Sequence, residues 1–194
     1  MTTIPPATTP EVATRLHVHR DAAGRPRLTA FEGPIAARVT GNRADGLDIA
    51  LLSTTATLLG GDDVRLDVRV AAGLWVTLTD IAATVAYDGR GAPAAWTAVL
   101  DVGAGASLLW RAEPFVVAGG ADVTRTTSAS LADGAALTLQ ETLVLGRSGE
   151  RGGAVTSEVR VDLAGAPLLR ERVRYAGDPA GQRFLRGDAR VLTT

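Results

Sequence analysis

Polar and apolar residues alternate along several stretches of this 194-residue chain. The alternation is strict over residues 65–70 and 157–163, and residues 75–79 are rich in side chains that favour strands. An alternation with a period of two puts the apolar side chains on one face of a strand. In contrast, no segment of a dozen residues has the apolar spacing of an amphipathic helix, and Gly and Pro are frequent. The sequence therefore predicts an all-β protein of stacked antiparallel sheets with few short helices.

A weak internal repeat surrounds Gly73, Gly105 and Gly134. At each glycine, one alternating stretch is joined to a second through a turn, and successive glycines are about 30 residues apart, within the range of repeat proteins. Two interpretations are open. The repeat indicates the stacked hairpins of a β-helix-like protein, in which each unit buries its apolar face only against its neighbours, or the regularly placed glycine turns of an ordinary β-sandwich.

The length of the chain corresponds to one domain of ordinary size. The Thr- and Pro-rich start predicts a disordered leader over residues 1–11, followed by a single all-β domain over residues 12–194. The start lacks the basic and apolar segments of a secretion signal, and no uncharged stretch approaches the roughly 20 residues of a membrane-spanning helix. We therefore expect a cytoplasmic protein that has no membrane partner.

The residue types that are missing exclude several kinds of chemistry. The chain has no Cys and no Lys, which excludes disulfides, thiolate nucleophiles, lysine Schiff bases and a P-loop lysine. Only two His are present, and His17 and His19 share one strand face. Because two ligands do not make a metal centre, an exposed pair of side chains is favoured over a metal site and over a cupin-like metalloenzyme. The net charge of −1 and the few aromatic residues do not support binding to nucleic acid.

Five short motifs follow one another between residues 33 and 150. They are Gly-Pro-Ile at 33–35, Gly-Gly-Asp-Asp-Val-Arg-Leu at 60–66, TLTDIAATVAY at 77–87, WRAEP at 110–114 and ETLVLGRSGE at 141–150. In this order and spacing they resemble the urease accessory protein family UreD, also called UreH. Asp80, Ile81 and Val85 stand where the family usually has Thr or Ser, Gln and Lys. The chain is shorter than most members and is identified as a short form of the family.

The resemblance implies a scaffold protein and not an enzyme. Members of the family bind apo-urease and recruit UreF and the nickel-loaded GTPase UreG, so that nickel is inserted into the urease active site. They consist of stacked β-sheets and have been pictured with an internal water-filled passage for the ion. We therefore expect no tightly bound cofactor and at most transient binding of Ni²⁺. Oxygen ligands suit such a role because they hold Ni²⁺ less tightly than Cys or clustered His.

Four polar residues at the matched motif positions are predicted to lie along the nickel path: Thr79, Asp80, Glu113 and Glu141. In a regular strand Asp80 falls on the face opposite Thr79, so the four cannot line one channel without a bulge or a strand end. Two of the carboxylates also have a simpler interpretation. Glu113 can be a solvated turn residue before Pro114, and Glu141 can be an exposed strand residue.

Other features have interpretations that need no nickel. Asp62 in the Gly-Gly-Asp motif can simply accept hydrogen bonds from backbone amides of a turn. Arg170, Arg172 and Arg174 form one face of a predicted strand, which favours a charged edge strand over a docking stripe for an acidic partner. The main alternative for the whole chain is a stand-alone β-sandwich binding module, for a sugar or a protein, with no nickel role.

Overall fold

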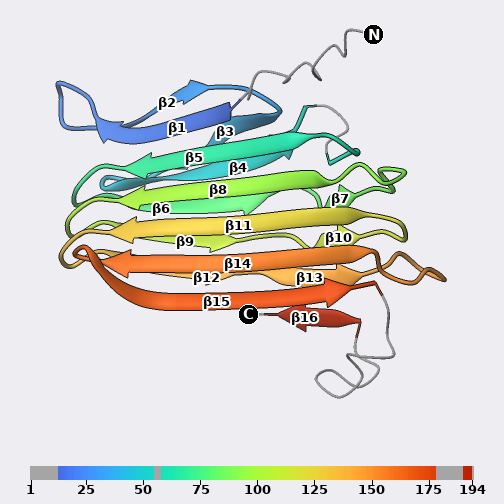
Figure 1. The fold of residues 1–194 in the computed structure, drawn as a ribbon. Coiled ribbons are helices and arrows are strands. Elements are labelled where there is room, and N and C mark those ends of the chain that lie inside the picture. The colour runs from blue at the N-terminus through green and yellow to red at the C-terminus, as the bar shows by residue number, and fades with distance from the viewer. Residues whose placement is uncertain (1–12, 55–57, 178–189, 194) are drawn as a thin grey trace, which may run out of the picture.

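The computed structural model describes residues 13–54, 58–177 and 190–193. These residues form sixteen strands in three sheets, and the longest sheet lies in front of the other two, so that the protein has two layers (Figure 1). No helix occurs among the described residues. The all-β prediction is therefore confirmed, although the few short helices expected are not found in this part of the chain. The leader predicted over residues 1–11 lies outside the described residues.

The first layer is a seven-stranded sheet, called the long sheet below, with the order β15-β14-β11-β8-β5-β1-β2. Its strands are β1 (Ala13–Arg20), β2 (Pro26–Phe31), β5 (Asp63–Val70), β8 (Ala94–Val102), β11 (Asp122–Leu131), β14 (Ala154–Leu163) and β15 (Ala166–Ala176).

The second layer consists of two shorter sheets. The five-stranded sheet, in the order β12-β9-β6-β4-β3, contains β3 (Ile35–Asn42), β4 (Gly46–Ser53), β6 (Trp75–Asp80), β9 (Ser107–Arg111) and β12 (Ala136–Gln140). The four-stranded sheet, in the order β16-β13-β10-β7, contains β7 (Thr84–Ala86), β10 (Phe115–Val117), β13 (Thr142–Leu145) and β16 (Val191–Thr193).

The chain winds through these sheets as a solenoid. Each coil adds one strand to each sheet in turn: β5, β6 and β7, then β8, β9 and β10, then β11, β12 and β13. The turns at Gly73, Gly105 and Gly134 lie on one another, since Gly73 N–H donates to Ala104 O and Gly105 N–H donates to Asp133 O, each over 3.0 Å. All three glycines have positive φ, between 63° and 69°, which costs a residue without Cβ little. The repeat in the sequence thus marks successive solenoid coils that stack on one another, as its β-helix-like interpretation predicted, but the predicted hairpins are wrong because the two strands at each glycine belong to different sheets.

The direction of strand pairing differs from the prediction. Successive coils pair in parallel, as in β5 with β8, β6 with β9 and β7 with β10. Among the described residues, antiparallel pairs occur only at the margins of the sheets, in β1–β2, β3–β4, β14–β15 and β13–β16. A turn such as the one at Gly73 joins strands of different layers and not the two arms of a hairpin, so each coil returns to the long sheet in the same direction. Alternation cannot reveal this direction because its period is two in both kinds of sheet.

Apolar side chains fill the space between the two layers. In β5, Val64, Leu66, Val68 and Val70 are buried, and Arg69 between them is exposed. Similar residues lie beside one another on successive coils, because in-register parallel pairing aligns them: Val68 pairs with Leu100, which pairs with Ala129. These aligned residues make the apolar core continuous from coil to coil.

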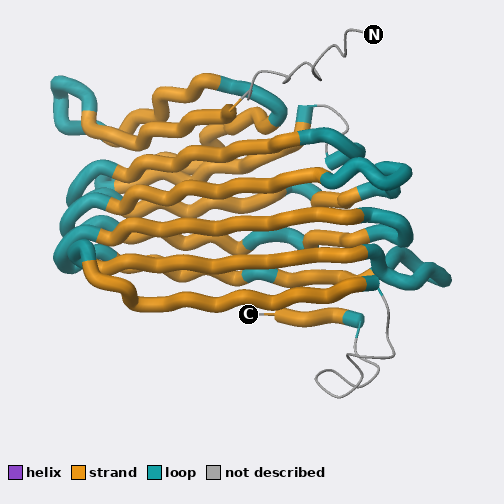
Figure 2. Tube along the Cα trace, viewed as in Figure 1, coloured by secondary structure: helices purple, strands orange, loops and turns teal. Residues whose placement is uncertain are grey.

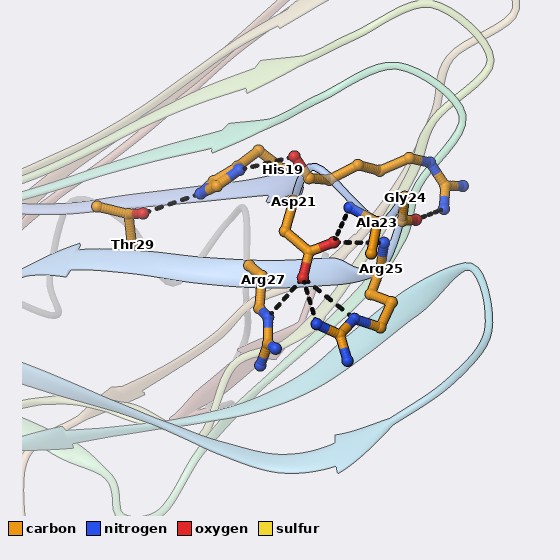
Figure 3. A network of polar contacts seen from close by, with 8 residues as sticks. His19, Asp21, Ala23, Gly24, Arg25, Arg27 and Thr29 are labelled. Carbon is orange, nitrogen blue, oxygen red and sulfur yellow. Dashed lines mark hydrogen bonds and ion pairs between the residues drawn. The ribbon is translucent and has the colours of Figure 1, made fainter.

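A hydrogen-bond network holds the turn between β1 and β2 at one margin of the long sheet (Figure 3). The Asp21 carboxylate accepts hydrogen bonds from the backbone N–H groups of Ala23 and Arg25, both over 2.9 Å, and from the Nε atoms of Arg25 and Arg27. These donors, the Arg25 N–H above all, lower the pKa of Asp21 to about 2. The turn is therefore fixed by one half-buried carboxylate with several partners.

The opposite margin of the long sheet is β15, an edge strand as predicted for the arginine-rich segment. Arg170, Arg172 and Arg174 are exposed, and Arg172 Nε lies 3.2 Å from Glu158 Oε1 on the neighbouring strand. Charged side chains of this kind protect an edge strand from pairing with other chains.

Candidate functional site

The second layer is interrupted once in every coil, between the five-stranded and the four-stranded sheet. The interruptions are residues 81–83, 112–114 and 141, and Figure 2 shows them as short loop segments within that layer. Three of the predicted site residues lie here. Asp80 is the last residue of β6, Glu113 lies in the second interruption, and Glu141 is the single residue between β12 and β13.

Register places two of these carboxylates at equivalent positions. Thr79 and Gln140 both pair with Arg111 of β9, so Asp80 and Glu141 each follow the last residue of their strand that pairs with β9. Asp80 is still paired with Leu51 on its other side, in β4. On β6 the buried residues are Val76 and Leu78, and Asp80 continues their face toward the interior. Thr79 is exposed on the outer face. A strand end, one of the two features that would let the predicted residues line one interior site, is therefore present. Thr79, however, does not face that interior.

Asp80 is held at the strand end by groups of the next coil. Trp110 Nε1 donates a hydrogen bond to Oδ1, and the backbone N–H of Glu113 donates to Oδ2, both over 3.2 Å. Burial raises the pKa of the Asp80 carboxyl, and these two hydrogen bonds oppose the rise. The side chain of Glu113 is itself exposed. The structure thus brings Asp80 and Glu113 together through the Glu113 backbone.

Glu141 belongs to a buried ion pair. Its side chain is 5% exposed, and Oε2 contacts Nη1 of Arg125, whose side chain is 4% exposed. Thr127 Oγ1 donates a hydrogen bond of 2.9 Å to Oε1 of the same carboxylate. Arg125 and Thr127 are neighbours on the inward face of β11, between the apolar residues Val123 and Ala129, in the opposite layer. The interpretation of Glu141 as an exposed strand residue is therefore wrong.

The surroundings of Arg125 are only partly polar. Its guanidinium carbon lies 5.4 Å from the centroid of the Phe115 ring, a cation–π contact. The Nη1 contact with Glu141 is an ion pair by distance but is not directed as a hydrogen bond, and Nε has no acceptor among the described residues. Trp96, which pairs in register with Arg125, likewise has its Nε1 buried without an acceptor in this part of the chain. A buried donor left unsatisfied costs about 1–3 kcal/mol, so these N–H groups favour a hydrogen-bond acceptor beside them.

We call these residues the interior cluster: Asp80, Trp96, Trp110, Arg125, Thr127 and Glu141. Two openings reach it. A cleft of about 290 Å³, the Asp80 cleft, contains Asp80 and Trp96 in its wall, and a groove of about 260 Å³, the Glu141 groove, contains Glu141. The remaining wall of the cleft is Ile35, Leu51, Leu52, Ser53, Ile81, Ala82, Ala83 and Thr84, and that of the groove is Leu131, Leu137, Leu139, Val159, Val161, Leu168, Leu169 and Glu171.

The cluster offers oxygen ligands and few of them. No group of three or more His, Cys, Asp or Glu side chains able to hold a metal ion occurs among the described residues. Two carboxylates and a hydroxyl, in contrast, are groups that bind a first-row dication weakly and exchange it readily. These oxygen ligands lie beside the cationic guanidinium of Arg125.

Sequence reasoning missed Arg125, Thr127, Trp96 and Trp110. The sequence could have singled out Arg125, because the alternation of β11 places it on the same strand face as Val123, Thr127, Ala129 and Leu131. A charged residue on an otherwise inward face needs a buried partner. That the partner is Glu141 follows only from the coil geometry, which brings two layers together.

Other candidate positions have simpler roles. His17 and His19 lie on the outer face of the long sheet with ring centroids 5.0 Å apart, and His19 Nε2 is hydrogen-bonded to Thr29 Oγ1 over 2.9 Å. His17 borders a hollow of about 680 Å³ on that face. Asp62 Oδ2 accepts a hydrogen bond from the Leu59 N–H, which is the turn role considered for it. In the part of the chain that the structure describes, no helix is long and apolar enough to span a membrane.

Comparison with known proteins gives one consistent family. Residues 12–194 match the family model described as UreD urease accessory protein. A protein of Streptomyces griseus named urease accessory protein UreD 1 is 47% identical over 165 residues, which cover 84% of this chain and 64% of that protein. The urease accessory protein UreD of Frankia alni is 39% identical over 94% of this chain and 74% of its own length. That of a Parafrankia species is 37% identical, and the match spans 56% of its length. The chain thus spans less than two thirds of some of the relatives that it matches.

Proposed function

Because the chain belongs to the UreD urease accessory protein family, we propose that it is a non-catalytic scaffold in urease maturation. In this proposal it binds apo-urease in the cytoplasm and recruits UreF and UreG, so that nickel is inserted into the urease active site. The relatives are named urease accessory proteins and not ureases, and these names favour a non-catalytic role.

The observation that carries the nickel role is the interior cluster with its two openings. Asp80 borders one opening and Glu141 borders the other, and both carboxylates point between the layers. In our proposal Ni²⁺ moves through the cluster by exchanging water for these carboxylate oxygens in turn. Oxygen ligands bind the ion weakly enough for release, which a carrier requires.

Glu113 and Thr79 have different places in this proposal. The exposed Glu113 carboxylate lies near enough to Asp80 to interact with it electrostatically, so it can attract a cation toward the Asp80 cleft. Thr79 is exposed on the outer face of β6, and the proposed path therefore rests on the three carboxylates.

A complementation experiment tests the proposal. Cells that produce urease, UreF and UreG but lack their own UreD would receive this chain, and the nickel content of the purified urease would be measured. We expect nickel in urease only when the chain is present, together with co-purification of UreF and apo-urease. Nickel-free urease and no co-purified UreF would support the alternative, a stand-alone binding module.

A further inference from the structure

We propose that Arg125 is a charge gate in the interior cluster: its guanidinium neutralises Glu141 until a divalent cation displaces it. The gate admits dications and excludes monovalent cations. This inference rests on the proposed function, because it assigns a step and a selectivity to the nickel path.

Arg125 is placed to control both carboxylates of the cluster. It forms the ion pair with Glu141 at the groove, and its charge also acts on Asp80 at the cleft. Its register neighbour Trp96 forms part of the cleft wall. A cation that passes from one opening to the other therefore meets the positive charge of Arg125 before Glu141 is available as a ligand.

The Arg125–Glu141 pair is not built as a rigid structural pair. A buried ion pair offsets its desolvation only when its geometry is good and the remaining donors are satisfied. Here Nε of Arg125 lacks an acceptor among the residues described, and the Nη1 contact is not directed as a hydrogen bond. Glu141 by contrast keeps a second partner, Thr127, which holds the carboxylate in place when the guanidinium leaves.

Two other groups interact favourably with the guanidinium. The Phe115 ring already contacts it, and Asp80 attracts it. The exchange therefore transfers Arg125 from one carboxylate toward the other, and no charge has to leave the interior.

Charge explains the selectivity. At equal distance a dication interacts with a carboxylate twice as strongly as a monovalent ion does, and the difference is largest where water is excluded. A sodium or potassium ion offers Glu141 no more charge than Arg125 already supplies. A divalent cation exceeds the guanidinium, so it alone opens the pair.

Calorimetric titration of the purified chain with Ni²⁺ tests the gate. The binding event to score is the one lost in Glu141→Gln. In Arg125→Met this event should become about tenfold tighter, because the guanidinium charge that is paired with Glu141 no longer has to be displaced. Arg172→Met is the matched control, since Arg172 pairs with Glu158 on the exposed face, and its affinity should equal that of the unchanged chain. Replacing choline chloride by sodium chloride at constant ionic strength should weaken nickel binding in Arg125→Met and not in the unchanged chain.

The outcomes separate the gate from the path. Equal Ni²⁺ affinities of Arg125→Met and the unchanged chain, or equal sodium sensitivities, would overturn the gate and leave the path. No Glu141-dependent binding in any variant would overturn both. If Arg125→Met does not fold, Arg125→Lys decides. A lysine should hold Glu141 less well, so tighter nickel binding supports the gate and unchanged binding overturns it.

Discussion

Two arginine–carboxylate groups in this protein are chemically similar but differ in surroundings. Asp21 lies in an exposed turn and accepts hydrogen bonds from two backbone amides and two arginines. These donors lower its pKa to about 2. Glu141 lies between the layers and is paired with an Arg125 that is incompletely hydrogen-bonded. The first group organises a turn in water, where charges cost little. The second keeps charges where they are costly, which indicates a role other than stability.

Of the substitutions that compare the Glu141 and Asp21 groups, Arg125→Met is expected to have the largest effect, on the free energy of unfolding. This change leaves the Glu141 carboxylate buried without its cation, which costs about 3–5 kcal/mol of unfolding free energy. The double variant Arg125→Met with Glu141→Gln should recover most of the loss, because no buried charge remains. Urea unfolding of both variants measures the difference. A loss in Arg125→Met no larger than that of Arg172→Met would remove the contrast between interior and surface.

Asp80→Asn should separate stability from function inside the cluster. Burial raises the pKa of Asp80, so any stability tied to its protonated form is present at low pH and is lost as pH rises through the raised value. At neutral pH a neutral amide removes the cost of the buried charge but offers one acceptor oxygen to two N–H donors. These effects oppose each other, so the unfolding free energy should change by no more than about 1–3 kcal/mol. The nickel content of urease matured with this variant should nevertheless fall, by about tenfold if Asp80 is a ligand. Full nickel loading would exclude Asp80 from the path.

Glu113→Gln should have a smaller effect on nickel loading than Asp80→Asn. The substitution removes an exposed charge but keeps the backbone N–H that donates to Asp80 Oδ2. Attraction of a cation by an exposed charge is weak and screened by salt, so the fall should be about twofold and should disappear at high ionic strength. Nickel in urease, measured beside a UreF pull-down, provides the comparison. A fall as large as that for Asp80→Asn would make Glu113 a direct ligand.

The smallest effect is expected for Asp21→Asn at the exposed turn. The folded-state pKa of about 2 lies below the ordinary value of 3.8, so the stability that Asp21 contributes is present above pH 3.8 and is lost as pH falls toward 2. The melting temperature of the variant should be slightly lower than that of the unchanged chain at pH 6, and the two should converge near pH 2. A difference that persists at pH 2 would mean that the turn does not depend on this charge.

Most of the fold was predictable because it follows from local pattern. Alternation in β5 marks a strand with one buried face, and the Gly73, Gly105 and Gly134 turns mark the coils. The parallel pairing was not predictable, since alternation is the same in both directions. For the site, motif matching selected Asp80 and Glu141 but could not separate them from Thr79 and Glu113, which point outward. Which of these side chains face inward depends on where each strand ends. The ion pair of Glu141 with Arg125 depends on contact between the two layers.

The nickel content of urease matured with Glu141→Gln tests the central claim most directly. Glutamine keeps the size of the side chain and can still accept the Thr127 hydrogen bond, but it lacks the charge. Glu158→Gln is the matched control, because Glu158 is a glutamate of the long sheet that pairs with Arg160 and Arg172. We predict that nickel per urease falls about tenfold or more with Glu141→Gln, in the range found when residues of a metal site are changed, and stays unchanged with Glu158→Gln, while UreF co-purifies with both. Equal and full nickel loading with both variants would contradict the claim that the interior carboxylates carry the ion.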